Sequence, residues 1–120
     1  GRVALGIFHS ANYFAPRLIA EFKKRYPHVD IRICIGSRND LFKAFRNFEF
    51  DFLIVGRPPE DMDIESQEIG DHPHIFVGAP DHPLINKNNL KLKELEREPF
   101  LVREKGSGTR FMMMKLFMLV

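Results

Sequence analysis

The chain has 120 residues, of which 44% are hydrophobic and 28% are charged, and its formal net charge at pH 7 is +2. This length and hydrophobicity are sufficient for one ordinary domain with a core, or for the first portion of a two-lobed one. Charges of both signs are interspersed, and no run of five like charges occurs. The composition therefore argues against a nucleic-acid-binding surface.

The single cysteine, Cys34, lies in an apolar run at residues 31–35 and has no second cysteine with which to form a disulfide. We expect it to be a buried thiol in a reducing compartment. No stretch approaches the roughly 20 apolar residues that span a bilayer, and no basic-then-apolar leader opens the chain. These observations predict a cytoplasmic protein without membrane contact.

Up to residue 56, strand-forming and helix-forming patterns alternate. Short apolar runs predict strands at 3–8, 31–35 and 52–55, the last of them buried on both faces. Between them, apolar residues at helical spacing predict helices at 14–26 and 41–48. Successive β-α-β units imply a parallel sheet with right-handed crossovers, so the predicted fold class is α/β.

After residue 56 the pattern changes. Alternating or continuous apolar runs predict further strands at 64–69, 75–79 and 100–103. Leucines before Pro99 predict a short helix, and a last, almost wholly apolar helix is expected at 111–120.

The composition shifts near Asp71, and we place a boundary between two lobes there. Residues 1–71 are expected to form a first lobe. Residues 72–120 are expected to begin a second lobe that is incomplete in this chain.

Five sequence landmarks resemble those of the effector-binding domain of LysR-type bacterial transcription regulators, and they occur in the family's order over nearly the whole chain. They are Val3-Ala4-Leu5-Gly6, Leu18-Ile19-Ala20-Glu21-Phe22 with Tyr26-Pro27, Phe50-Asp51-Phe52-Leu53-Ile54, Asp81-His82-Pro83-Leu84 and Gly106-Ser107-Gly108-Thr109-Arg110. Two further segments, at 56–61 and 102–104, are closest to the subgroup that regulates carbon-fixation (RuBisCO and Calvin-cycle) operons.

The resemblance implies a type 2 periplasmic-binding-protein-like fold, in which two α/β lobes enclose an effector in the cleft between them. It implies a regulatory domain, not an enzyme, that binds a small anionic metabolite, uses no cofactor and forms homo-oligomers. The family's N-terminal winged helix-turn-helix is absent from this chain, so we expect operator DNA to be contacted only through that domain. A solute-binding protein of a transport system, which shares the fold, is the alternative interpretation.

A ligand site in an open α/β sheet is expected beyond the carboxyl ends of the strands, where helix N-termini present free N–H groups. Polar segments at 9–12, 37–39 and 106–110 have this position, and Arg57 follows the third strand. Their hydroxyl, amide and guanidinium groups suit an anion. The resemblance implies effector contacts in these same loops, and the candidate residues are Ser10, Asn12, Ser37, Asn39, Arg57, Ser107 and Thr109.

Some of these residues also have simpler interpretations. Ser10 and Ser37 are typical helix caps, although a capping residue can also touch a ligand. Arg57 could instead pair with Glu60 or Asp61 at the edge of the lobe. The residue types alone leave both alternatives open.

Metal binding and catalysis receive less support from the sequence. His72 and His74 would share one face of a strand, with His82 nearby along the chain, but no carboxylate or thiol completes a ligand set. His9 stands beside Ser10 without a strained Gly-x-Ser-x-Gly turn or an orienting acid. We therefore predict no bound metal and no catalytic residue.

Overall fold

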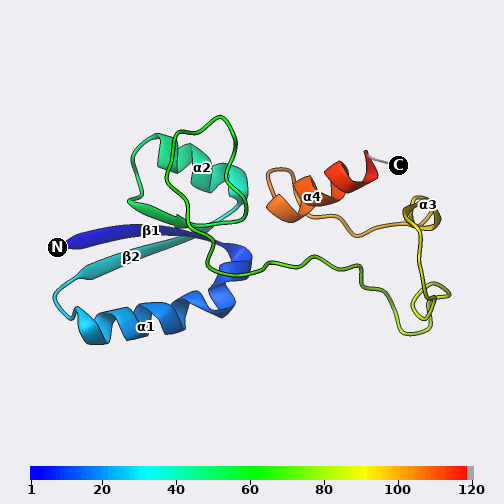
Figure 1. The fold of residues 1–120 in the computed structure, drawn as a ribbon, viewed down its shortest axis with the longest axis horizontal. Coiled ribbons are helices and arrows are strands. Elements are labelled where there is room, and N and C mark those ends of the chain that lie inside the picture. Colours follow the sequence, from blue (N-terminus) through cyan, green and yellow to red (C-terminus); the bar gives the residue numbers. More distant parts are fainter. Residues whose placement is uncertain (119–120) are drawn as a thin grey trace.

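The computed structural model describes residues 1–118, and its first half is built on a three-stranded sheet (Figure 1). Strands β1 (Arg2–Phe8), β2 (Asp30–Gly36) and β3 (Phe52–Ile54) are ordered β2-β1-β3, and both pairs are parallel. The parallel sheet predicted from the alternating pattern is therefore confirmed.

The predicted helices of this half are also confirmed. Helix α1 (Ala15–Arg25) follows a short 3-10 helix, η1 (His9–Tyr13), and helix α2 (Arg38–Arg46) joins β2 to β3. The two α-helices lie on opposite sides of the sheet (Figure 1). This arrangement follows from the strand order. The connections from β1 to β2 and from β2 to β3 run in opposite directions across the sheet, and right-handed crossovers of opposite direction place their helices on opposite faces.

The core of this half is small. Ile7 at the centre of the sheet packs with Ala11 and Ala15, and Leu41 and Phe42 of helix α2 are buried on the other side. Small residues in η1 and at the start of α1 let these elements approach the sheet closely.

Gly6 serves the same purpose on the α2 side. A Cβ atom at this position would lie 2.6 Å from Leu53 Cδ2 and 3.0 Å from Leu41 Cδ2. A larger residue at position 6 would therefore force these side chains to move.

Two burial expectations in the sheet are wrong. Cys34 is half-buried and Phe52, at the start of β3, is 63% exposed. Both residues lie on edge strands, which among residues 1–118 have a neighbour only on the β1 side. Continuous apolar character therefore did not mean burial on both faces here.

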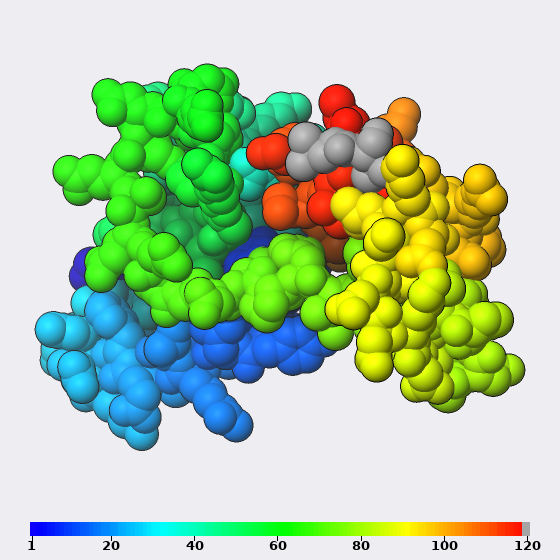
Figure 2. Space-filling model, turned by 45° about the vertical axis from the view of Figure 1, so that its right-hand side comes forward, coloured from blue at the N-terminus to red at the C-terminus, as the bar shows by residue number. Residues whose placement is uncertain are grey.

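The second half has a different construction. The chain leaves the sheet through a long extended stretch, here called the crossing segment (residues 64–79), which is exposed throughout residues 71–80. Figure 2 shows it in light green, joining the half that contains the sheet to the yellow part of the chain. Two helices follow, α3 (Leu92–Leu95) and α4 (Gly108–Phe117).

The strands predicted at 64–69, 75–79 and 100–103 are absent from the part of the chain that the structure describes. The physical reason is that a strand requires a hydrogen-bonded neighbour, and none of these segments lies beside another strand. Their apolar pattern makes them able to form strands, but no partner pairs with them.

The helix expected at 111–120 is confirmed in type, although it begins earlier, and residues 119 and 120 lie outside the described residues. It has no buried residue, but Phe117 packs with Phe76 and Phe100 at ring-centroid distances of 6.2 and 5.6 Å. Within residues 1–118, no helix combines the length and the apolar character needed to cross a membrane.

Candidate functional site

A cavity of about 550 Å³ lies between the carboxyl ends of the strands and helix α4. Its walls come from η1, the start of α2, the loop at 55–60, the crossing segment and the first turns of α4. Both halves of the chain therefore contribute to one cavity, at the edge of the sheet where a ligand site was expected.

Five of the seven candidate residues line this cavity, and they are Ser10, Ser37, Arg57, Ser107 and Thr109. Asn39 instead lines a second cavity of about 500 Å³, which shares Ser37 with the first. Asn12 lines neither cavity and is exposed. A 3-10 helix has about three residues per turn, so Ser10 and Asn12 of η1 point in different directions.

Two of the serines cap helices at the edge of the cavity. Ser37 Oγ accepts a hydrogen bond from the Asp40 N–H at 3.2 Å, and Ser107 Oγ accepts one from the Arg110 N–H at 3.4 Å. Each hydroxyl keeps its own hydrogen as a donor, so capping leaves it able to bind an anion as well. The capping interpretation is thus confirmed for Ser37, and it does not exclude contact with a ligand.

Ser10 is different, because neither η1 nor α1 is capped by a side chain. The capping interpretation of Ser10 is therefore wrong. Its hydroxyl lines the cavity without that role.

The two helix N-termini also differ in their backbone N–H groups. At α2, the Asn39 N–H already donates to the Gly106 carbonyl at 3.3 Å and the Asp40 N–H to Ser37. At α4, the N–H groups of Gly108 and Thr109 have no acceptor among residues 1–118. The start of α4 is therefore the better anion-binding terminus of the two.

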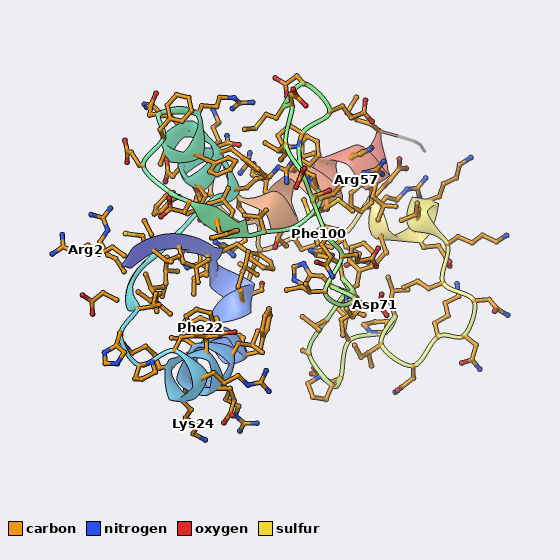
Figure 3. The ribbon with its side chains drawn as sticks, turned by 60° about the vertical axis from the view of Figure 1, so that its left-hand side comes forward. Arg2, Phe22, Lys24, Arg57, Asp71 and Phe100 are labelled. Atoms are coloured by element: carbon orange, nitrogen blue, oxygen red, sulfur yellow. The ribbon has the colours of Figure 1, made fainter. Side chains whose placement is uncertain are left out.

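Arg57 forms no ion pair with Glu60 or Asp61, the alternative that the residue types left open. Asp61 lies 3.3 Å from Arg46 instead, and Arg57 forms no ion pair with any residue that the structure describes. Figure 3 shows Arg57 in the loop after β3, beside helix α4. Its guanidinium is thus available to a carboxylate or phosphate, which it can bind through two parallel hydrogen bonds.

Sequence analysis missed Arg38, which contacts the same loop. Its guanidinium donates to the Arg57 carbonyl at 2.6 Å and lies 4.9 Å from the Phe42 ring and 5.6 Å from the Phe111 ring. Desolvation by burial lowers the pKa of Arg38, but a guanidinium remains charged at neutral pH. Arg38 thus connects helix α2, the loop at 55–60 and helix α4 around a fixed positive charge.

Arg103 also lines the cavity and was not predicted. Its guanidinium makes two hydrogen bonds of 2.8 Å to the neighbouring carboxylate of Glu104. The side-chain hydrogen bonding with Arg103 is the main cause that lowers the pKa of Glu104 to about 2. The same hydrogen bonding is the main cause that raises the pKa of Arg103. Part of the positive charge of Arg103 is therefore already neutralised.

The remaining ionisable residues of the cavity are His9, Glu60, His72, His74 and Lys115. Glu60 is the only carboxylate among the lining residues, so positive charge predominates. Among residues 1–118, no group of three histidine, cysteine or acidic side chains is arranged to hold a metal ion. His82, the third candidate ligand, does not line the cavity and lies 3.1 Å from Glu98.

A family model, described as the LysR substrate binding domain, matches residues 1–119. Among curated proteins, the chain is 43% identical over 118 residues to "HTH-type transcriptional regulator CbbR" of Xanthobacter flavus. It is 42% identical over 110 residues to the regulator CfxR of Cupriavidus necator. A "RuBisCO operon transcriptional regulator" of Allochromatium vinosum is 33% identical over 117 residues. These matches cover 98%, 92% and 98% of this chain but only 35%, 35% and 39% of the three relatives.

A solved structure of the CcmR regulatory domain of Synechocystis PCC6803, in complex with 2-PG, superimposes with a TM-score of 0.84 at 34% identity. The match covers 99% of this chain and 57% of that one. It confirms the predicted type 2 periplasmic-binding-protein-like α/β fold. The transport alternative is not favoured, because the relatives are named transcriptional regulators. The chain therefore belongs to the LysR substrate-binding-domain family, and it is similar to regulators of the carbon-fixation subgroup.

Proposed function

We propose that this chain is the effector-sensing domain of a LysR-type transcriptional regulator of carbon-fixation genes, and that it binds a small phosphorylated or carboxylic acid anion in the cavity. The observation that carries the proposal is the excess of positive charge in the cavity, where Arg38, Arg57, Arg103 and Lys115 face a single lining carboxylate. Positive groups in such number favour a ligand with more than one negative charge.

Three kinds of group in the cavity complement such an anion. Arg57 offers a planar pair of donors for a carboxylate or phosphate. The N–H groups of Gly108 and Thr109 offer donors that have no other partner among the described residues. The hydroxyls of Ser10, Ser37 and Ser107 add neutral donors around the same space. This set is suited to holding an anion in place, and the names of the relatives as transcriptional regulators support a sensor and not an enzyme.

The matched CcmR structure supports the chemical class of the ligand. That domain was solved with 2-PG, 2-phosphoglycolate, a small anion with a carboxylate and a phosphate. The cavity in the present chain is within the size range of small-molecule sites. We therefore take 2-PG as the first probe, with other phosphorylated acids as alternatives.

Regulation would follow from the position of the cavity. Residues 1–71 and 72–120, which we assign to a first lobe and to the beginning of a second, both contribute to its walls. A ligand that bridges them favours one relative arrangement, and only such a difference in affinity between arrangements can transmit a signal. In the regulator, this change would act in the cytoplasm on paired subunits and reach operator DNA through a winged helix-turn-helix domain.

The test is calorimetric titration of the chain with 2-PG, with the CcmR regulatory domain as the positive control. Arg57→Ala should weaken binding by about ten- to a hundredfold, because hydrogen bonds to charged groups contribute roughly 1.5–3 kcal/mol. Arg25→Ala removes the same charge from helix α1 outside the cavity and should leave binding unchanged. Unaltered affinity in Arg57→Ala, or no binding of 2-PG or any related anion, would contradict the proposal.

A further inference from the structure

Three of the five histidines of the chain, His9, His72 and His74, line the cavity. The rings of His72 and His74 lie 4.5 Å apart, and the His72 ring meets the Phe8 ring edge-on at 5.0 Å. Phe8 ends strand β1, so this contact places the exposed crossing segment against the end of the sheet at the edge of the cavity.

The two imidazoles pack through their ring faces and edges, but their nitrogens have no polar partner among the described residues. No hydrogen bond or ion pair to either ring is found among residues 1–118, and no metal-binding group includes them. Neutral imidazoles gain little from a wall that is otherwise cationic. They become useful there only if something negative enters the cavity.

Ionisable residues from several elements line the cavity around these rings. The other ionisable lining residues are His9 from η1, Arg38 from α2, Arg57 and Glu60 from the loop at 55–60, and Arg103 and Lys115 from the region of α4. Desolvation, followed by the neighbouring His74, lowers the pKa of His72 below its usual range. This shift favours the neutral form of His72 before a ligand binds.

An anion with two or more charges would shift the proton equilibrium of the imidazoles in the opposite direction. Negative charge a few ångströms from the imidazoles favours their protonated forms, in which both ring nitrogens donate hydrogen bonds. We propose that His72 and His74 are effector-binding residues which take up a proton when the anion binds, so that the domain responds jointly to effector and pH. This inference rests on the proposed function, since it requires an anion in the cavity.

The direction of the pH dependence follows from linkage. A group that holds its proton more tightly in the complex makes binding stronger as the pH falls through the interval between its free and bound pKa values. A difference of one pKa unit corresponds to about a tenfold change in affinity. The phosphate of 2-PG also titrates, near pH 6, so a ligand of constant charge is needed to isolate the contribution of the protein.

The experiment is calorimetry of the chain with sulfoacetate, whose carboxylate and sulfonate stay ionised from pH 6 to 8, and with 2-PG. Titrations at pH 7 in buffers of different ionisation enthalpy give the protons taken up per ligand bound. We expect net uptake for both ligands and an affinity for sulfoacetate that rises about tenfold from pH 8 to pH 6. The double variant H72Q/H74Q should lose the uptake and the pH dependence, whereas His28→Gln, outside the cavity, should retain both.

His74→Gln alone serves as a second variant, because the ring contact with Phe8 is made by His72 and is retained in this variant. Binding without proton uptake, or uptake that persists in both H72Q/H74Q and His74→Gln, overturns this inference and leaves the proposed function standing. Failure of both ligands to bind the wild-type chain overturns the proposed function and this inference together.

Discussion

The region that contains the sheet, residues 1–56, and the region that follows it, residues 57–118, hold their structures in different ways. In the first, strand pairing and the packing of Ile7, Leu41 and Phe42 join residues distant in sequence. In the second, Leu95 is the one buried hydrophobic residue among those described, and the ion pairs within the region join residues no more than 16 positions apart. Positions farther apart in this region are linked by the partly exposed rings of Phe76, Phe100 and Phe117. Similar apolar patterns thus give a packed fold only where strands find neighbours.

Removal of an apolar side chain should affect the free energy of unfolding very differently in the two regions. Ile7→Ala should lower the free energy of unfolding by about 2–5 kcal/mol, because it leaves a cavity at the centre of the sheet. Leu101→Ala removes an apolar side chain of similar size from a fully exposed position, and it should change that free energy by no more than about 0.5 kcal/mol. Urea unfolding followed by circular dichroism measures both values.

The two variants differ in region but not in the chemistry of the change. If Leu101→Ala proved as destabilising as Ile7→Ala, residues 57–118 would contain a hydrophobic core that includes Leu101, contrary to the exposure of its side chain. A small effect of Ile7→Ala would equally contradict the assignment of the core to the sheet.

The same contrast explains which parts of the fold were predictable. The strands and helices up to residue 56 follow from local periodicity, and the rule that crossovers are right-handed turns that order into a sheet. The strands expected at 64–69 and 75–79 have equally good local patterns, but pairing is a tertiary property that no pattern within a segment contains. The predicted burial of Phe52 and Cys34 was wrong for the same reason, because a sequence does not show which strand lies at the edge of a sheet.

The candidate site divides along a similar line. Ser37, Arg57 and Ser107 were predictable, because they stand at strand ends or helix starts, and those positions are set locally. Arg38 and His72 were not, because they reach the cavity through contacts with Arg57, Phe111 and Phe8 that form only when distant segments meet. The position of Arg38 directly after the candidate Ser37 was a signal in the sequence that could have identified it.

The helix caps of the two regions should differ in their effect on stability. Ser37→Ala should lower the free energy of unfolding by about 1 kcal/mol, because α2 packs Leu41 and Phe42 onto the sheet and the loss of its cap destabilises the whole region. Ser107→Ala removes the equivalent bond from α4, which has no buried residue. Its loss should fray α4 locally and leave the main unfolding transition almost unchanged.

Urea unfolding and amide hydrogen exchange separate these two outcomes. Ser107→Ala should speed exchange within α4, and Ser37→Ala should speed it throughout the amides of the sheet as well. A shift of the main transition in Ser107→Ala as large as that in Ser37→Ala would mean that α4 and the sheet unfold as one unit.

The smallest expected effect concerns the pH dependence of Glu104, whose pKa of about 2 is set mainly by its hydrogen bonds with Arg103. A carboxyl whose pKa is depressed stabilises the structure above its ordinary range and loses that contribution as the pH falls toward about 2. Both side chains are exposed, so their pair should contribute little to the free energy of unfolding. NMR titration should nevertheless find the Glu104 midpoint near 2, and Arg103→Gln should return it toward the ordinary carboxyl range.

Repeating that titration in urea asks whether the pair needs the fold at all. Arg103 and Glu104 are neighbours in sequence, so their attraction requires no tertiary structure, and part of the depression should survive when the sheet unfolds. If the midpoint instead returned fully to the ordinary carboxyl range in urea, the pair would depend on the folded arrangement around α4. Contacts beyond adjacency in the chain would then hold Arg103 and Glu104 together.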